Sequence, residues 1–146
     1  MNLAPPERGC VIRYAYLWAD EHKRGREEAR KGRPALVLAL SVRRDDGQTE
    51  VLALAVTHSP PTESTDAVAL SSAVKRRLKL DDDASWIVTT EANAFIWPGP
   101  DIRPIPDRTP TSVVYGKIPD DLLREVARSF LANRKRQQAQ LVPRTS

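Results

Sequence analysis

An arginine and a threonine stand at the two ends of a pair of apolar segments, residues 33–43 and 50–57. An Asp-Gly dipeptide between the segments favours a tight turn, so we expect an antiparallel hairpin. Arg33 starts the first strand and Thr57 ends the second, which makes them neighbours. A guanidinium binds two phosphate oxygens at once, and a hydroxyl adds a hydrogen bond. The spacing indicates a phosphate-binding pair; the alternative is that Arg33 pairs with a glutamate of the preceding loop and Thr57 merely ends its strand.

The loop before Arg33 carries a cluster of basic residues, which suits contact with the phosphates of a nucleic acid. The chain has a formal net charge of +4 and a sequence pI near 9.5. Two further basic clusters follow at residues 75–79 and 134–136. The plainer interpretation of such clusters is a solvated charged surface. The candidates for RNA binding in the first cluster are Lys23, Arg24, Arg26, Arg30 and Lys31.

Soft metal ligands are scarce, since the chain has one cysteine, Cys10, and two histidines, His22 and His58. A single cysteine excludes an internal disulfide, and this set does not make a structural zinc site, so we expect no metal and no cofactor. The first ten residues lack the apolar region of a signal peptide, and the longest apolar run is far shorter than the roughly 20 residues of a membrane helix. We therefore expect a cytoplasmic protein without membrane contact.

An α+β fold is expected to hold these residues in place. Short strands are predicted beside the hairpin, together with a short helical turn at 71–80 and a long C-terminal helix that begins at Pro119. The additional strands are predicted at 9–18, 67–70, 84–92 and 112–118. Such a set predicts a mostly antiparallel sheet curled into a small β-barrel. A single domain is expected over residues 9–133, with residues 1–8 and 134–146 as flexible termini.

The proline-punctuated stretch 93–106 is expected to be a loop. Trp97 lies in this stretch and is the aromatic residue best suited to stack on an RNA base, with packing or a dimer contact as the alternative. Trp18 and Trp86 close or open predicted strands and are expected in the core.

The order of five segments resembles the MazF/PemK/Kid family of toxins from type II toxin–antitoxin systems. The segments are GCVIRYAYL, a charged loop with glutamate, GRPALVLAL, VLALAVTHS and WIVTTEAN, and the resemblance covers roughly residues 9–130. That family has an opening strand, a loop that ends in an acidic residue and Arg-Pro, a hydrophobic strand, and a strand that ends in Thr-Ser. The spacing is closer to the PemK-like members than to the shortest MazF-like ones.

This resemblance implies a small SH3-like barrel that works as a homodimer and cleaves single-stranded RNA without a metal. Arg33 and Thr57 match its site residues, and Glu28 matches its loop acid, with the adjacent Glu27 as an alternative. Ser59 matches the serine of the Thr-Ser pair. The resemblance also implies a cognate antitoxin as partner, and contact with operator DNA only as the toxin–antitoxin complex.

The sequence departs from the family at two places. In the plasmid-borne branch an arginine and an aspartate, two residues apart, act from a later strand. Those positions fall on Thr89 and Glu91, so the acid is retained in kind and the arginine is missing. His58 also stands between Thr57 and Ser59. These departures leave the identity of the acid and the base open.

Metal-free cleavage of RNA uses the neighbouring 2′-OH as nucleophile. The site takes a proton from that hydroxyl, stabilises the charge of the phosphorane and protonates the departing 5′-oxygen. Arg33 is the candidate for the charge, Glu28 for the base, and Thr57 for orienting the phosphate. His58 is a candidate acid because its reference pKa lies near 6.5, although strand alternation directs it away from Thr57.

Two other functions fit the sequence. A toxin of the same fold that binds a protein target, similar to the gyrase poison CcdB, needs no catalytic site. A nucleic-acid-binding relative without activity would fit the missing arginine at Thr89. The spacing of Arg33, Glu28 and Thr57 favours the endoribonuclease toxin.

Overall fold

A computed structural model of the 146-residue chain describes residues 3–20, 32–136 and 140–144. The strands within these residues are β1 (Cys10–Tyr14), β2 (Arg33–Val42), β3 (Thr49–Thr57), β4 (Ala67–Ala69), β5 (Trp86–Val88), β6 (Glu91–Trp97), β7 (Val114–Lys117) and β8 (Gln140–Pro143). The helices are α2 (Ser72–Arg77) and α3 (Asp120–Lys135). The predicted α+β class is confirmed. No helix in the described part of the chain is long and apolar enough to cross a membrane.

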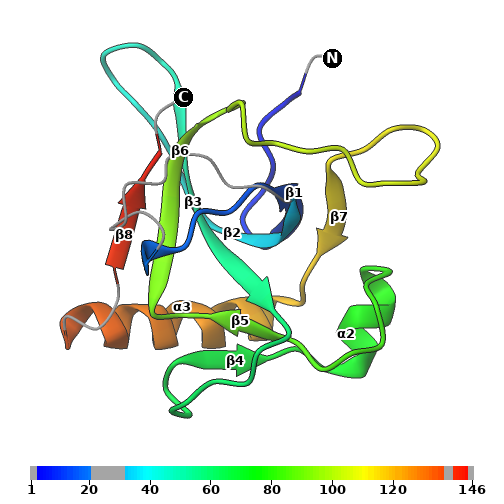
Figure 1. Ribbon diagram of the computed structural model, residues 1–146. Helices are drawn as coiled ribbons and strands as arrows, with labels where there is room; N and C mark the ends of the chain where they lie inside the picture. The colour runs from blue at the N-terminus through cyan, green and yellow to red at the C-terminus, as the bar shows by residue number, and fades with distance from the viewer. Residues whose placement is uncertain (1–2, 21–31, 137–139, 145–146) are drawn as a thin grey trace.

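The predicted hairpin is present as β2 and β3, whose antiparallel pairing runs from Ala35 opposite Ala55 to Val42 opposite Thr49. Gly47 takes a φ of +71° in the turn, a conformation that glycine adopts without steric cost. The carboxylate of Asp46 accepts a hydrogen bond from the N–H of Gln48 at 3.0 Å, which holds the turn. The hairpin extends away from the rest of the molecule, with its turn at the top of Figure 1.

Strand β3 organises the sheet because it changes partner along its length. Its first half pairs with β6 and its last two residues, Val56 and Thr57, pair with β5. The sheet runs in the order β4-β5-β3-β2-β1-β7, while β6 pairs with β3 and β8. The pairs are antiparallel, as predicted, except that β8 runs parallel to β6. Among the described strands, β4, β7 and β8 each pair with one neighbour, so the sheet is open.

The two faces of the hairpin pack against different layers. The leucine face, with Leu36 and Leu54, joins one buried cluster with Val126 and Phe130 of α3. Helix α3 crosses beneath the sheet in Figure 1, with α2 at its right-hand end. The alanine face joins a second cluster that contains the aromatic rings of β1 and β6. Small alanines leave room for these rings, so the alternation in the sequence matches the layers of the fold.

The stretch 93–97, predicted as a loop, belongs instead to strand β6. The predicted strand at 84–92 is correspondingly divided into β5 and the start of β6. Ala92, Asn93 and Phe95 of this strand are all buried. The prolines that suggested a loop begin only at Pro98, directly after the strand ends. That part of the prediction was wrong.

The C-terminal residues also differ from the prediction of a flexible terminus at 134–146. Strand β8 lies beside β6, with Gln140 opposite Glu91 and Val142 opposite Asn93. Val142 is buried, and the guanidinium of Arg144 donates to the carboxylate of Asp101 at 2.8 Å. Residues 140–144 therefore form part of the packed structure. Near the other end, Leu3 is also bonded to the packed structure, because its carbonyl oxygen accepts a hydrogen bond from Nε1 of the buried Trp97.

Candidate functional site

Arg33 is the first residue of β2 and pairs with Tyr14 of β1. Its guanidinium carbon lies 5.1 Å from the centroid of the Trp18 ring, a distance suited to a cation–π contact. The Nε atom of Arg33 is buried and has no hydrogen-bond partner among the described residues. A buried donor without an acceptor costs about 1–3 kcal/mol. Arg33 is thus a fixed cation with unused hydrogen-bonding capacity.

Thr57 lies at the neighbouring strand end, as the hairpin predicted. Ala35 pairs with Ala55, and continuing this register by two residues places Arg33 across from Thr57. The Thr57 hydroxyl oxygen accepts a hydrogen bond from the N–H of Ser59 at 3.1 Å. That bond orients the hydroxyl and leaves its proton available to a ligand.

An open pocket of about 310 Å³ lies between the end of β3 and the segment that follows β1. Trp18 and Thr57 both line it, so Trp18 connects the pocket to Arg33. The lining combines an aromatic ring, hydroxyls, two prolines and a carboxylate, contributed by Trp18, Thr57, Ser59, Pro60, Pro61, Thr62, Asp66, Ala67, Val88 and Thr90. A positive group next to an aromatic wall suits a nucleotide, which offers a phosphate and a flat base.

Glu91 fixes the segment that carries Trp18. Its Oε1 accepts hydrogen bonds from the N–H of Ala19 at 2.9 Å and from the hydroxyl of Tyr16 at 3.2 Å. Burial, reinforced by the Glu91 carboxylate, holds the pKa of Tyr16 well above its usual range, so this hydroxyl remains a donor. The Tyr16 ring in turn meets Trp18 edge-on at 5.0 Å. Glu91 therefore positions the wall of the pocket.

Thr89 lies on the other side of the sheet, toward α3. It is fully buried, and its hydroxyl is 2.8 Å from that of Ser129 and accepts from the side-chain amide of Asn133 at 3.1 Å. The next residue, Thr90, lines the pocket, as alternation requires. The arginine that the family resemblance expects at this position would have to enter the packed layer between β5 and α3.

His58 contacts a different group from the one predicted. Its Nε2 is 2.9 Å from a carboxylate oxygen of Asp81, and it is absent from the described lining of the pocket. The hydrogen bond from Lys75 and the nearby His58 lower the pKa of Asp81 below its usual value. The hairpin register thus places Arg33 and Thr57 at adjoining strand ends, whereas His58 contacts Asp81 instead of lining the pocket.

A candidate cation site exists in the same place. His58, Asp81 and Asp83 bring potential ligand atoms within 4.8 Å of one another, and all three are exposed. The buried ammonium of Lys75 already donates to Asp81 at 2.8 Å, to the carbonyl oxygen of Asp83 and to Ser85 at 2.7 Å. Lys75 therefore supplies the positive charge that this loop requires.

Trp97 does not fit the role of a base-stacking residue. It is 6% exposed, packs against Phe95 and donates from Nε1 to the carbonyl oxygen of Leu3 at 3.1 Å. Of the two alternatives given for Trp97, the structure shows packing, because Trp97 ends a strand instead of lying in a loop. The aromatic residue at the pocket is Trp18, which the sequence analysis assigned to the core; its position between a strand and a charged loop was the available signal.

Several predicted site residues lie outside the described residues. These are the candidate base Glu28, its neighbour Glu27, and the basic cluster of Lys23, Arg24, Arg26, Arg30 and Lys31. Ser59 is exposed and lines the pocket through the turn after β3.

A scan against protein-family models found no match to this chain, and a search of curated proteins found none either.

Proposed function

We propose that this chain is a metal-independent endoribonuclease that acts as the toxin of a type II toxin–antitoxin system. The observation that carries the proposal is the position of Arg33, which lies against Trp18 with its Nε unpaired among the described residues, while Trp18 and Thr57 line one pocket. Arg33 and Thr57 are the residues that the resemblance to the MazF/PemK/Kid toxins assigns to the site. An SH3-like barrel belongs to this proposal, and the change of partner along β3 supports it.

The chemistry assigned to these residues follows from their types. Arg33 binds the non-bridging oxygens of the scissile phosphate, and this interaction becomes stronger as negative charge develops on the phosphorane. The hydroxyl of Thr57 donates a hydrogen bond to the same phosphate. The 2′-OH attacks phosphorus as the bond to the 5′-oxygen breaks, and the departing oxygen takes a proton from a water molecule, which yields a 2′,3′-cyclic phosphate and a 5′-hydroxyl. Glu28 is proposed as the base that accepts the proton of the 2′-OH.

The proposed assembly is a homodimer that its antitoxin inhibits. Each described outer strand, β4, β7 and β8, leaves one backbone edge unpaired, and such edges are sites for strand addition. An acidic segment of the antitoxin would be attracted by the positive charge of the chain and would cover Arg33.

The proposal is tested by incubating the purified chain in EDTA with a single-stranded RNA and with DNA of the same sequence. We expect cleavage of the RNA to cyclic-phosphate and 5′-hydroxyl ends, and no cleavage of the DNA. A requirement for a divalent metal, or equal cleavage of DNA, would contradict the mechanism. RNA binding without cleavage would indicate the inactive relative, and capture of gyrase without RNA binding would indicate the CcdB-like alternative.

A further inference from the structure

The pocket that Trp18 and Thr57 line contains one carboxylate among its described lining residues, that of Asp66. Its place is fixed by the backbone on both sides. The N–H of Asp66 donates to the carbonyl oxygen of Glu63 at 3.0 Å, and its carbonyl oxygen accepts from the N–H of Thr89 at 2.9 Å. These bonds attach Asp66 both to its own turn and to the end of β5.

The carboxylate of Asp66 keeps most of its capacity to accept hydrogen bonds. Oδ2 accepts one bond, from the N–H of Glu63 at 3.2 Å. An ionised carboxylate offers about four acceptor sites on two oxygens, so both oxygens can still receive a donor from a ligand. A group that only accepts hydrogen bonds selects ligands that present donors.

We propose that this pocket is a subsite for one RNA base next to the scissile phosphate, and that Asp66 makes it selective for guanine. The inference rests on the proposed function, since it names the substrate feature read by the same site. Trp18 supplies the face on which the base stacks, and the flat sides of Pro60 and Pro61 line the pocket with it. A volume of about 310 Å³ suits a single base better than a longer segment of RNA.

Guanine follows from the pattern of donors on the bases. Its Watson–Crick edge carries two adjacent donors, N1–H and the N2 amino group, which match the two oxygens of one carboxylate. Adenine, cytosine and uracil each place an acceptor beside their donor on that edge, and such an acceptor would face the negative charge of Asp66. The hydroxyls of Thr62 and Thr90 can bond to either a donor or an acceptor on a base, so they add contacts without selecting the base.

The substitution Asp66→Asn tests this directly, because it keeps the shape and replaces one acceptor by a donor. Short single-stranded RNAs that contain one guanosine in an otherwise adenosine and uridine sequence are compared with RNAs in which inosine or adenosine replaces it. Inosine lacks the N2 amino group and so retains one of the two donors. Cleavage rate and binding affinity are measured in parallel, in EDTA, for the full chain.

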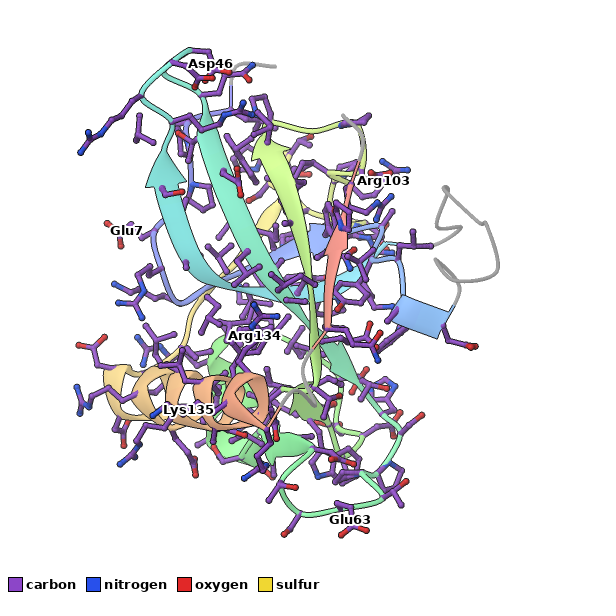
Figure 2. The ribbon with its side chains drawn as sticks, turned by 90° about the vertical axis from the view of Figure 1, so that its left-hand side faces the viewer. Glu7, Asp46, Glu63, Arg103, Arg134 and Lys135 are labelled. Atoms are coloured by element: carbon purple, nitrogen blue, oxygen red, sulfur yellow. The ribbon has the colours of Figure 1, made fainter. Side chains whose placement is uncertain are left out.

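For the unchanged chain we expect guanosine to be preferred over adenosine by about 10- to 100-fold, with inosine between them. Asp66→Asn should abolish this preference, so that the guanosine, inosine and adenosine RNAs are cleaved at similar rates. The matched control is Asp45→Asn, an exposed carboxylate in the hairpin turn. Figure 2 shows the neighbouring Asp46 at one end of the molecule and Glu63, close to the pocket, at the opposite end.

Three results would overturn the inference while the proposed function stands: cleavage without a preference for guanosine, a preference that survives Asp66→Asn, or an equal loss of cleavage on every RNA. The last result would make Asp66 an acid or base of the reaction. Guanosine-selective binding that depends on Asp66 but occurs without any cleavage would support the subsite and contradict the endoribonuclease.

Discussion

The guanidinium of Arg33 lies over the indole ring of Trp18, 5.1 Å from the ring centroid, and its buried Nε has no acceptor in the part of the chain that the structure describes. An aromatic face holds a cation in position without neutralising its charge, because the ring carries no negative charge. This contact distinguishes Arg33 from the many arginines that merely pair with a neighbouring carboxylate. It also gives Trp18 two roles, as support for Arg33 and as a wall of the pocket.

Replacing Trp18 by leucine should lower kcat/KM for RNA by about 10- to 100-fold, because both the cation–π contact and base stacking are lost. Trp18→Phe should retain most of the activity, since it keeps a ring. The matched control is Trp97→Phe, a buried tryptophan that packs on Phe95. We expect that control to lower stability and leave the cleavage rate of the folded protein unchanged.

Thr89 should respond to substitution through stability. Thr89→Val removes the hydroxyl bonded to Ser129 and Asn133 and should cost about 1–3 kcal/mol of unfolding free energy. Thr89→Arg introduces the arginine that the family resemblance leads one to expect, yet it should destabilise the chain further and give no gain in cleavage, because the side chain at position 89 faces α3. Urea unfolding and the RNA assay check both. An active, stable Thr89→Arg protein would show that this position reaches the pocket.

Arg144 should be important for stability despite its place near the end of the chain. It donates to Asp101 at 2.8 Å, to the side-chain oxygen of Asn93 at 3.1 Å and to the carbonyl oxygen of Ala15 at 3.1 Å. Arg144→Ala leaves the carboxylate of Asp101 without this partner and should cost about 3–5 kcal/mol. Arg124 lies on the exposed face of α3, so Arg124→Ala should lower the free energy of unfolding by at most about 0.5 kcal/mol. Equal unfolding midpoints for the two variants would contradict the packed C-terminus.

The acid limb of stability should depend on Asp81. Its pKa is lowered in the folded state by the hydrogen bond from Lys75, so the stabilisation is fully present above its ordinary value and is lost as the pH falls below about 4. Asp81→Asn should therefore reduce stability at neutral pH and flatten its decline in acid. Thermal unfolding between pH 7 and pH 2 measures this. An acid limb identical to that of the unchanged chain would contradict the role of Asp81.

The hairpin and the long helix were predictable because their signals are local. The turn dipeptide and the alternation of leucine and alanine specify the register, and this register places Arg33 and Thr57 at adjoining strand ends. The apolar spacing of Leu123, Val126 and Phe130 likewise specifies the buried face of α3. These features require no knowledge of distant residues.

The features that the sequence did not reveal depend on contacts between distant segments. Strand β8 has four residues, QLVP, of which three are exposed and the last is a proline, so its pairing with β6 and the burial of Val142 define it as a strand. Asp66 reaches the pocket because the segment after β3 folds back onto β5, which no local pattern predicts. The family resemblance matches Glu91 to an acidic residue of the RNA site, and its bonds to Tyr16 and Ala19 show that it also supports the pocket wall.

The measurement that tests the central claim most directly is single-turnover cleavage of single-stranded RNA in EDTA by the Arg33→Ala variant. Loss of one preorganised donor to the transition state should slow cleavage by roughly 10²–10³ while the fold is retained. Arg33→Lys should recover only part of the rate, since lysine keeps the charge and loses the planar fork. The matched control is Arg43→Ala, a partly exposed arginine of the hairpin turn, which should cleave at the parent rate. An Arg33→Ala protein that is folded and cleaves RNA as fast as the unchanged chain would contradict the account.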